Sequence, residues 1–266
     1  NAIREKYFNL GDNIRVAVRS SATAEDLPSA SFAGQQETYL NVQGIDDVLI
    51  NIRNCYASLW SNRAVSYRFN QEYNQSSVCI AVVIQEMVDS EKSGVLFTVN
   101  PVNKREDEMQ INASFGLGES IVSGRVTADN YIVGKNGKII DKSISNKETS
   151  IVYDAKGTVE VELDEYYKRK STLNDNQLLE LSRIGMDIEK HYAMPMDIEW
   201  AIKDDIIYIL QARAITTLNS DEIREDEIRQ YLQGKSLNGS MKTNMAFLKN
   251  VISHPEFRSG EMTTTF

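Results

Sequence analysis

The sequence predicts an α+β fold with more than one lobe. Three features favour this class: stretches with the apolar spacing of amphipathic helices, near-continuous apolar runs typical of buried strands, and a series of short alternating strands separated by polar turns. The 266 residues, 41% of them hydrophobic and 25% charged, suit about two globular domains.

The first part of the chain is expected to form a strand, a loop and a second strand, over residues 14–18 and 31–42. One long amphipathic helix is then predicted over residues 45–70. Its buried positions recur at steps of four, three and four residues, at Val48, Ile52, Cys55 and Leu59. We expect Trp60 and Tyr67 to widen this buried face.

The middle of the chain predicts a sheet. Near-continuous apolar runs indicate buried, parallel-like strands at 78–88, 94–99 and 109–114. A run of antiparallel strands is expected at 129–134, 138–145, 148–153 and 158–163.

A helix is predicted over residues 174–193, with Asn174 or Asp175 as its N-cap. Its apolar stripe comprises Leu178, Leu181, Ile184 and Ile188. Two strands follow, over 197–202 and 206–212. From residue 221 the chain is polar and is expected to be helical without strands.

Composition disfavours several functions. The net charge of −9 speaks against a nucleic-acid-binding surface, which needs a basic face. The longest apolar run has seven residues, Val78 to Ile84, whereas a membrane span needs roughly 20. Cys55 and Cys79 form no CxxC motif, and no signal peptide is recognisable. We therefore expect a cytoplasmic protein that binds neither nucleic acid nor membrane.

The first candidate binding segment is the run Arg19-Ser20-Ser21-Ala22, which leaves a strand and enters a polar loop ending at residues 31–36. An arginine at a strand end can pair with phosphate through two hydrogen bonds, and small residues let backbone N–H groups approach a ligand. An ordinary surface loop with a solvated arginine would give the same pattern.

The second candidate is the closing hairpin. Alternation places Asp197 and Glu199 on one face, and Gln211 and Arg213 share a face of the partner strand. With a three-residue loop Glu199 lies opposite Gln211, and with a two-residue loop it lies opposite Leu210. In the first register these two side chains could offer oxygens to Mg²⁺, with Arg213 on phosphates. A structural ion pair beside a solvated glutamine is the alternative.

The third candidate is the segment Gln85-Glu86-Met87-Val88, at the end of an apolar strand. Its backbone could hydrogen-bond an adenine edge while Met87 packs on the ring. Ordinary core packing would explain the same residues.

Taken together, these segments resemble the nucleotide-binding domain of the phosphoenolpyruvate synthase and pyruvate phosphate dikinase family, which has an ATP-grasp fold. The similar stretches are VAVRSSATAEDLPSASFAGQQETYLNV (16–42), QEMVDSEKSGVLFTVNP (85–101), NASFGLGESIVSGRVTADNY (112–131) and DIEWAI…YILQARAIT (197–216). The resemblance covers residues 1–218, and it implies that ATP and Mg²⁺ are the ligands.

The resemblance also implies a role for each matching residue. Arg19 and Arg213 would contact the phosphates as the catalytic residues. The phosphates would be covered by the loop around Ala33, Gly34 and Thr38. Adenine would be held by Gln85, Met87 and Val88. Magnesium would be held by Glu199 and Gln211.

Members of this family phosphorylate a histidine on a separate swivelling domain, which passes the group to pyruvate or another small acceptor. The histidine motif of that domain is absent here, and we interpret His191 and His254 as structural or solvated. The family domain also begins further upstream, with a lysine, so the fold is expected to be N-terminally truncated. Rifamycin phosphotransferases share this ATP domain and fit equally well.

The tail, residues 219–266, resembles the last subdomain of biotin carboxylases in the segments 239–248 and 253–260. An amphipathic helix packed on the main body is the simpler explanation. Two rivals to the phosphotransferase interpretation thus remain: a biotin-dependent carboxylase component, and a non-catalytic nucleotide-binding module.

Overall fold

The computed structural model describes residues 2–11, 13–22, 26–27, 30–31, 37–70, 78–118, 126–154 and 157–215. The chain divides into two units, residues 1–218 and 219–266. The predicted helical tail falls in the second unit and lies outside the described residues. The predicted loop residues Ala33 and Gly34 also lie outside the described residues.

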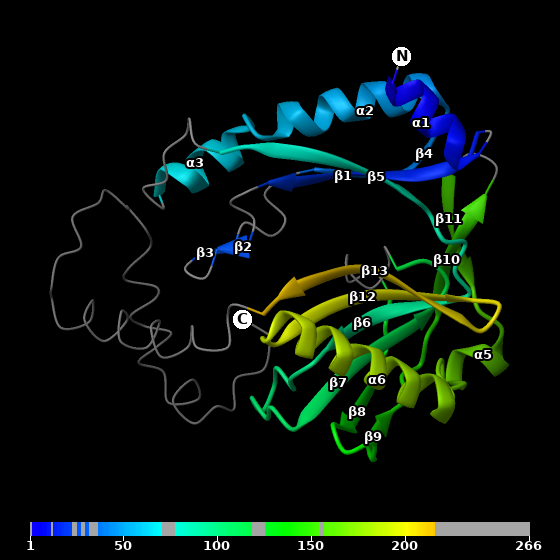
Figure 1. Cartoon of the computed structure of the whole chain (residues 1–266). Coiled ribbons are helices and arrows are strands. Elements are labelled where there is room, and N and C mark those ends of the chain that lie inside the picture. Colours follow the sequence, from blue (N-terminus) through cyan, green and yellow to red (C-terminus); the bar gives the residue numbers. More distant parts are fainter. Residues whose placement is uncertain are drawn as a thin grey trace, which may run out of the picture. The chain divides into compact units, whose positions relative to one another are not determined.

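The first sheet has three antiparallel strands in the order β4-β1-β5. Its strands are β1 (Arg15–Ala22), β4 (Thr38–Gln43) and β5 (Ile80–Glu86). Three helices accompany it: α1 (Ala2–Leu10), α2 (Ile45–Ser58) and α3 (Asn62–Asn70). Figure 1 shows α1 and α2 along the outer face of this sheet. The core between sheet and helices is formed by Tyr7, Val16, Val18, Val42, Val48 and Cys55.

The single helix predicted over residues 45–70 is wrong, because the chain turns between Leu59 and Ser61 and starts a new helix. The Ser61 carbonyl accepts from Val65 N at 3.0 Å, and its hydroxyl accepts from Ala64 N at 3.3 Å. A serine at this point satisfies N–H groups that a helix start leaves without partners. Trp60 is consequently 60% exposed rather than buried.

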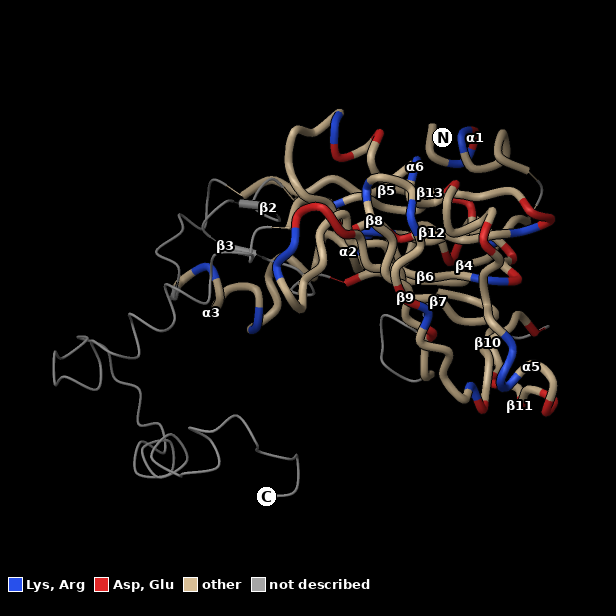
Figure 2. Tube along the Cα trace, turned by 90° about the horizontal axis from the view of Figure 1, so that it is seen from below, with Lys and Arg blue, Asp and Glu red and all other residues tan. Residues whose placement is uncertain are grey.

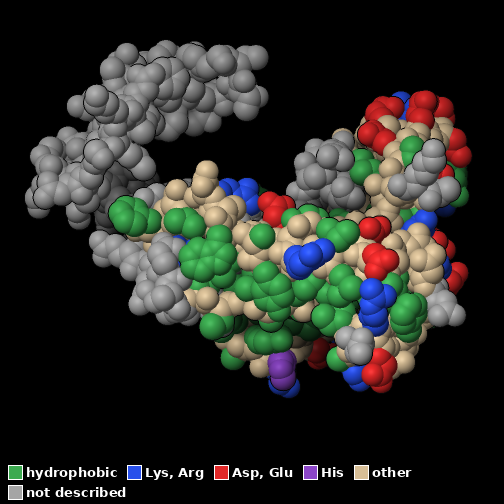
Figure 3. All heavy atoms as spheres, turned by 90° about the horizontal axis from the view of Figure 1, so that it is seen from above, with side chains coloured by type: hydrophobic (Ala, Val, Ile, Leu, Met, Phe, Trp, Pro, Cys, Tyr) green, Lys and Arg blue, Asp and Glu red, His purple; other side chains and the backbone are tan. Residues whose placement is uncertain are grey.

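The helices leave large apolar side chains exposed on the outer side of this layer. Figure 3, which looks down on this side, shows a broad hydrophobic area there. The exposed side chains on these helices and on the turn between α2 and α3 are Ile3, Phe8, Leu10, Ile50, Tyr56, Trp60 and Phe69.

The second sheet has six strands in the order β13-β12-β6-β7-β8-β9. The strands are β6 (Lys92–Phe97), β7 (Glu108–Phe115), β8 (Asp129–Gly134), β9 (Ile139–Ser143), β12 (Met196–Lys203) and β13 (Ile206–Ala214). Every neighbouring pair in it is antiparallel. The expectation of parallel-like strands is therefore wrong: β7 is buried along almost its whole length although both of its neighbours run antiparallel to it, and a helix layer covers one face of the sheet.

Helix α6 (Asp175–Tyr192), which the sequence predicted over residues 174–193, supplies that cover. Asn174 is its N-cap: the Asn174 side chain accepts from Gln177 N at 2.9 Å, and the Gln177 side chain accepts from Asn174 N at 3.2 Å. Such a reciprocal capping box fixes the first turn. Leu178 and Leu181 then bury themselves against the sheet, in a core that includes Trp200 and Ile198.

The smaller elements are two hairpins and a short helix. Strands β10 (Thr149–Asp154) and β11 (Gly157–Glu162) pair with each other and not with β9, so the predicted antiparallel run is split between two sheets. The two-residue strands β2 (Asp26–Leu27) and β3 (Ala30–Ser31) form another hairpin. Helices α1 and α5 (Glu165–Arg169) were not predicted. Across the described ranges, every helix is too short or too polar to cross a membrane.

Strands β12 and β13 meet in the register that the candidate site needs, but for a different reason from the one proposed. The loop has two residues, Asp204 and Asp205, both with positive φ (49° and 57°). A two-residue loop alone would set Glu199 opposite Leu210. A β-bulge between Glu199 and Trp200 shifts the pairing by one residue, so that Glu199 lies opposite Gln211.

Gly94 in β6 permits the close packing of β7 and the Trp200 ring. A Cβ built on Gly94 would lie 2.0 Å from the Asn112 carbonyl oxygen and 2.4 Å from Trp200 Cζ2. We predict that Gly94→Ala lowers the free energy of unfolding by about 3 kcal/mol, because backbone cannot yield to the added methyl group. Chemical denaturation measures this.

Gly118→Ala is the matched control, since its Cβ would meet Ser93 only at an ordinary 3.6 Å. The control should stay within about 0.5 kcal/mol of the unaltered chain. Equal stability of the two variants would contradict this packing argument.

Candidate functional site

A cavity of about 310 Å³ lies between the two sheets. Residues of β1, β4 and β5 line it from one side, and residues of β6, β12 and β13 from the other. Six of the predicted site residues line it: Arg19, Thr38, Gln85, Met87, Val88 and Glu199. The tertiary structure thus gathers residues that are 180 positions apart in the sequence.

One part of the cavity wall is apolar. It includes Ala17, Leu40, Met87, Val88, Leu117 and Leu210. The Met87 segment is fixed from two sides, because Met87 N donates to the Arg15 carbonyl at 3.0 Å and the Asn41 N–H points at Met87 Sδ at 2.9 Å. An apolar cleft with a few placed polar groups is the usual form of a small-molecule site.

The polar part of the cavity is organised around Arg19. Its guanidinium donates to Gln85 Oε1 at 3.3 Å and to Gln211 Oε1, and Nη2 lies 3.6 Å from Glu199 Oε2. The Gln85 amide in turn donates to the Leu210 carbonyl at 3.1 Å. The Gln85 amide, predicted to hold adenine, therefore contacts Arg19 of its own sheet through its oxygen and Leu210 of the facing sheet through its nitrogen.

Arg213, on β13, lies close to the carboxylates of Glu199 and Asp197. Its Nη2 lies 3.8 Å from Glu199 Oε1 and 3.7 Å from Asp197 Oδ2. Both arginines and both acidic side chains are about one-fifth to one-quarter exposed. Figure 2 shows acidic and basic residues interspersed along the described chain. The cluster of Arg19, Arg213, Glu199 and Asp197 is therefore not part of a larger basic surface. Its two guanidinium groups could donate hydrogen bonds to phosphate oxygens without a large basic surface.

Asp197 is a member of the cluster to which sequence reasoning gave no role. The signal for it was present, because strand alternation puts Asp197 on the same face as Glu199. Its Oδ1 is buried with no hydrogen-bond partner among the described residues. Burial raises the pKa of Asp197 and the Glu199 charge adds to this, while Arg213 lowers it.

The oxygen atoms of Glu199, Gln211 and Asp197 are the hard ligands that Mg²⁺ takes, usually one or two carboxylates together with water and phosphate. Only two of these three residues are carboxylates. A cluster of three or more His, Cys, Asp or Glu side chains that could hold a metal ion does not occur in the described part of the chain. His191, at the exposed end of α6, stacks edge-on against Tyr192 and lines no part of the cavity. His254 lies outside the described residues.

Comparison with known proteins identifies the family. The model of the pyruvate phosphate dikinase AMP/ATP-binding domain matches residues 1–234. The chain belongs to this family.

Named relatives of the dikinase-domain family are phosphotransferring enzymes. A probable phosphoenolpyruvate synthase of Pyrococcus horikoshii is 53% identical over 240 residues, which are 85% of this chain and 29% of the relative. A rifampicin phosphotransferase of Bacillus subtilis is 46% identical over 218 residues, 82% of this chain and 25% of the relative. A probable phosphoenolpyruvate synthase of Archaeoglobus fulgidus is 44% identical and matches 100% of this chain with 34% of its own length. The chain therefore spans about a third or less of these relatives.

The raised pKa of Asp197 predicts a pH-dependent stability in this dikinase-family domain. The folded state holds the Asp197 proton more tightly than the unfolded chain, so the ionised carboxylate destabilises the fold as pH rises through its folded pKa. Asp197→Asn, a neutral variant of the same shape, should therefore be slightly more stable than the unaltered chain at pH 7. Urea denaturation should show this gain shrinking toward pH 4. A loss of stability at pH 7 would mean that the Arg213 contact outweighs burial.

Proposed function

We propose that the chain binds Mg·ATP in the cavity between the two sheets, as the ATP-grasp domain of a phosphoenolpyruvate synthase-like phosphotransferase. The observation that carries the proposal is the meeting of Arg19, Glu199, Gln211 and Arg213 beside an apolar cavity. Membership of the AMP/ATP-binding family supports it. The position of the cavity between two sheets also supports the ATP-grasp assignment, since that fold holds nucleotide between two sheets.

The adenine ring would lie against Met87 and Val88 in the apolar part of the cavity. The phosphates would then reach the guanidinium groups of Arg19 and Arg213, with Thr38 beside them. Phosphoryl transfer depends mainly on positioning and on neutralising phosphate charge, and two arginines suit both tasks.

Magnesium would be held by Glu199 and Gln211, and the unpartnered Oδ1 of Asp197 supports an additional polar partner at this place. When bound, the metal would neutralise phosphate charge. The residues of this chain would supply its oxygen ligands. Glu199 also offsets the repulsion between the two arginines, because its oxygens lie within 4 Å of both guanidinium groups.

We propose that the complete protein transfers a phosphoryl group from ATP to a histidine on a separate swivelling domain, and from there to pyruvate. A rifampicin-type acceptor is the second candidate, favoured by the 46% identity to the Bacillus subtilis phosphotransferase. Pyruvate and rifampicin, offered separately to the complete protein with ATP, distinguish the two. Apart from the resemblance of the tail, nothing in the described residues favours a carboxylase. The domain limits 1–218 and 219–266, with a helical tail, stay predictions, as does the cytoplasmic location.

Calorimetry with ATP, with and without Mg²⁺, tests the nucleotide site in the 266-residue chain. Arg213→Ala should weaken Mg·ATP binding by about tenfold or more, because a phosphate loses a charged partner in a partly buried site. Glu199→Gln should bind ATP alone as well as the unaltered chain but should lose the gain from Mg²⁺.

Glu189→Gln is the matched control for these variants. Glu189 pairs with Lys135 at 2.7 Å, is about as exposed as Glu199, and lines no part of the cavity. Its ATP affinity should stay within about twofold of the unaltered chain. Failure of the folded, unaltered chain to bind ATP in either condition would contradict the proposed nucleotide site in this chain.

A further inference from the structure

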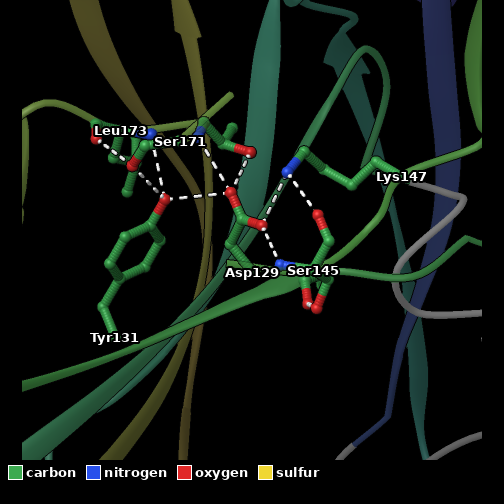
Figure 4. A network of polar contacts seen from close by, with 8 residues as sticks. Asp129, Tyr131, Ser145, Lys147, Ser171 and Leu173 are labelled. Atoms are coloured by element: carbon green, nitrogen blue, oxygen red, sulfur yellow. Dashed lines mark hydrogen bonds and ion pairs between the residues drawn. The ribbon is translucent and has the colours of Figure 1, made fainter. Parts of the chain in front are cut away.

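A buried ion pair lies behind the cavity, outside the proposed ligand contacts. Asp129 begins β8, Lys147 precedes β10, and both side chains are fully buried, with Lys147 Nζ 2.7 Å from Asp129 Oδ1. Figure 4 shows Asp129 between Lys147 and Ser145 on one side and Tyr131 on the other. Burying two charges costs several kcal/mol per ion, so such a pair is retained only where its geometry is fully satisfied.

The Asp129 carboxylate is satisfied in this way, because it accepts five hydrogen bonds. Oδ1 accepts from Lys147 Nζ and from Ser145 N at 2.9 Å. Oδ2 accepts from Thr172 N and Thr172 Oγ1, each at 2.8 Å, and from the Tyr131 hydroxyl at 3.0 Å. One carboxylate therefore fixes β8, the segment before β10 and the approach to α6.

Lys147 connects the Asp129 carboxylate to the strand that leads into the cavity wall. Its Nζ also donates to the Ser145 carbonyl at 3.1 Å and lies 5.8 Å from the centre of the Phe115 ring. Phe115 ends β7, and the next residues, Gly116 and Leu117, lead directly into the cavity wall.

The segment after Lys147 holds that wall by its backbone. Leu117 N donates to the Ile151 carbonyl at 2.8 Å, and Gly116 forms a parallel bridge with Ile151. A Cβ on Gly116 would lie 2.3 Å from the Ile151 oxygen and 2.5 Å from Ser150 Oγ. Because the backbones of Gly116 and Ile151 are in close contact, a shift of residues 147–151 must also move Leu117.

The opposite side of Gly116 is fixed as well. Ser93 Oγ and Ser90 Oγ both donate to the Gly116 carbonyl, at 2.7 and 3.1 Å, and Gly116 N donates to the Glu91 carbonyl at 2.8 Å. Ser90 itself lines the cavity. The wall formed by Leu117 and Gly118 is thus clamped between the β5–β6 connection and the segment that Lys147 anchors.

We propose that Asp129 and Lys147 are positioning residues for the nucleotide cavity, setting its Leu117–Gly118 wall through Phe115 and Ile151. This inference rests on the proposed nucleotide site. It assigns a binding role to a pair that contacts no ligand, and it predicts that the pair affects affinity separately from its effect on stability.

The test compares Lys147→Met with Thr172→Val in the 266-residue chain. Lys147→Met removes the cation on the cavity side of Asp129. Thr172→Val removes one hydrogen bond to the same carboxylate on the side facing α6, and keeps the side-chain shape. Each variant is measured by thermal unfolding, by amide hydrogen exchange at Leu117 and by calorimetry with Mg·ATP.

Both variants should be less stable than the unaltered chain. Only Lys147→Met should speed exchange at Leu117 and raise the Kd for Mg·ATP, by about fivefold or more at a temperature where it is folded. Thr172→Val should leave both within about twofold. Unchanged exchange and unchanged Kd in folded Lys147→Met, or equal effects of the two variants, would overturn the proposal.

If Lys147→Met does not fold, the double variant Asp129→Asn with Lys147→Met replaces it, since a neutral pair leaves no unpaired buried charge. The same two readouts, exchange at Leu117 and Kd, decide it. If the unaltered chain binds no ATP, the proposed function fails. The exchange comparison then decides by itself whether the pair positions this wall.

Discussion

The Arg19 guanidinium joins the two sheets of the domain. It leaves β1 in the three-stranded sheet and contacts Gln211 and Glu199 in the six-stranded sheet, while Gln85 bridges from β5 to the Leu210 carbonyl. A planar group with several donors can hold three partners in fixed directions, which a lysine cannot. The polar part of the cavity therefore has its shape because one side chain satisfies acceptors from three different strands.

That contact depends in turn on an irregularity in the hairpin. The bulge between Glu199 and Trp200 changes the pairing, so that Glu199 and Gln211 lie side by side and both face Arg19. Trp200 meanwhile stays in the core on the other face of the sheet, against Gly94. A bulge thus lets one strand present a polar pair to the cavity without removing its apolar residues from the core.

The arrangement of Asp197 beside Glu199 and Arg213 lowers the stability of the fold at the proposed binding site. Asp197 is held with a raised pKa and an unpartnered oxygen, an arrangement that costs folding free energy. Asp129, in contrast, has both carboxylate oxygens hydrogen-bonded and lies away from the cavity lining. Asp197 thus has an unpartnered carboxylate oxygen beside Arg213 of the proposed site, whereas the Asp129 carboxylate, away from the cavity lining, is fully hydrogen-bonded, as a rigid support for a binding site requires.

The sequence by itself determined the elements whose signals are local. The 174–193 helix, its Asn174 cap and its Leu178–Leu181 stripe follow from residues within four positions of one another. The limits of β8 follow from alternation alone. The residue types of the site were also visible: strand alternation groups Asp197 with Glu199 and Gln211 with Arg213, and Arg19 stands at the end of a predicted strand.

Only the tertiary structure decided which elements meet. The break at Leu59–Ser61 arises where helix spacing continues but the chain turns, and the antiparallel order of the six strands depends on long-range pairing. From the sequence, the Glu199–Gln211 register required a three-residue loop and a two-residue loop excluded it, whereas in the structure a two-residue loop and a bulge produce it. Neither a bulge nor the 192-residue separation of Arg19 and Gln211 leaves a local pattern, because both are set by how the sheets pack on each other rather than by neighbours along the chain.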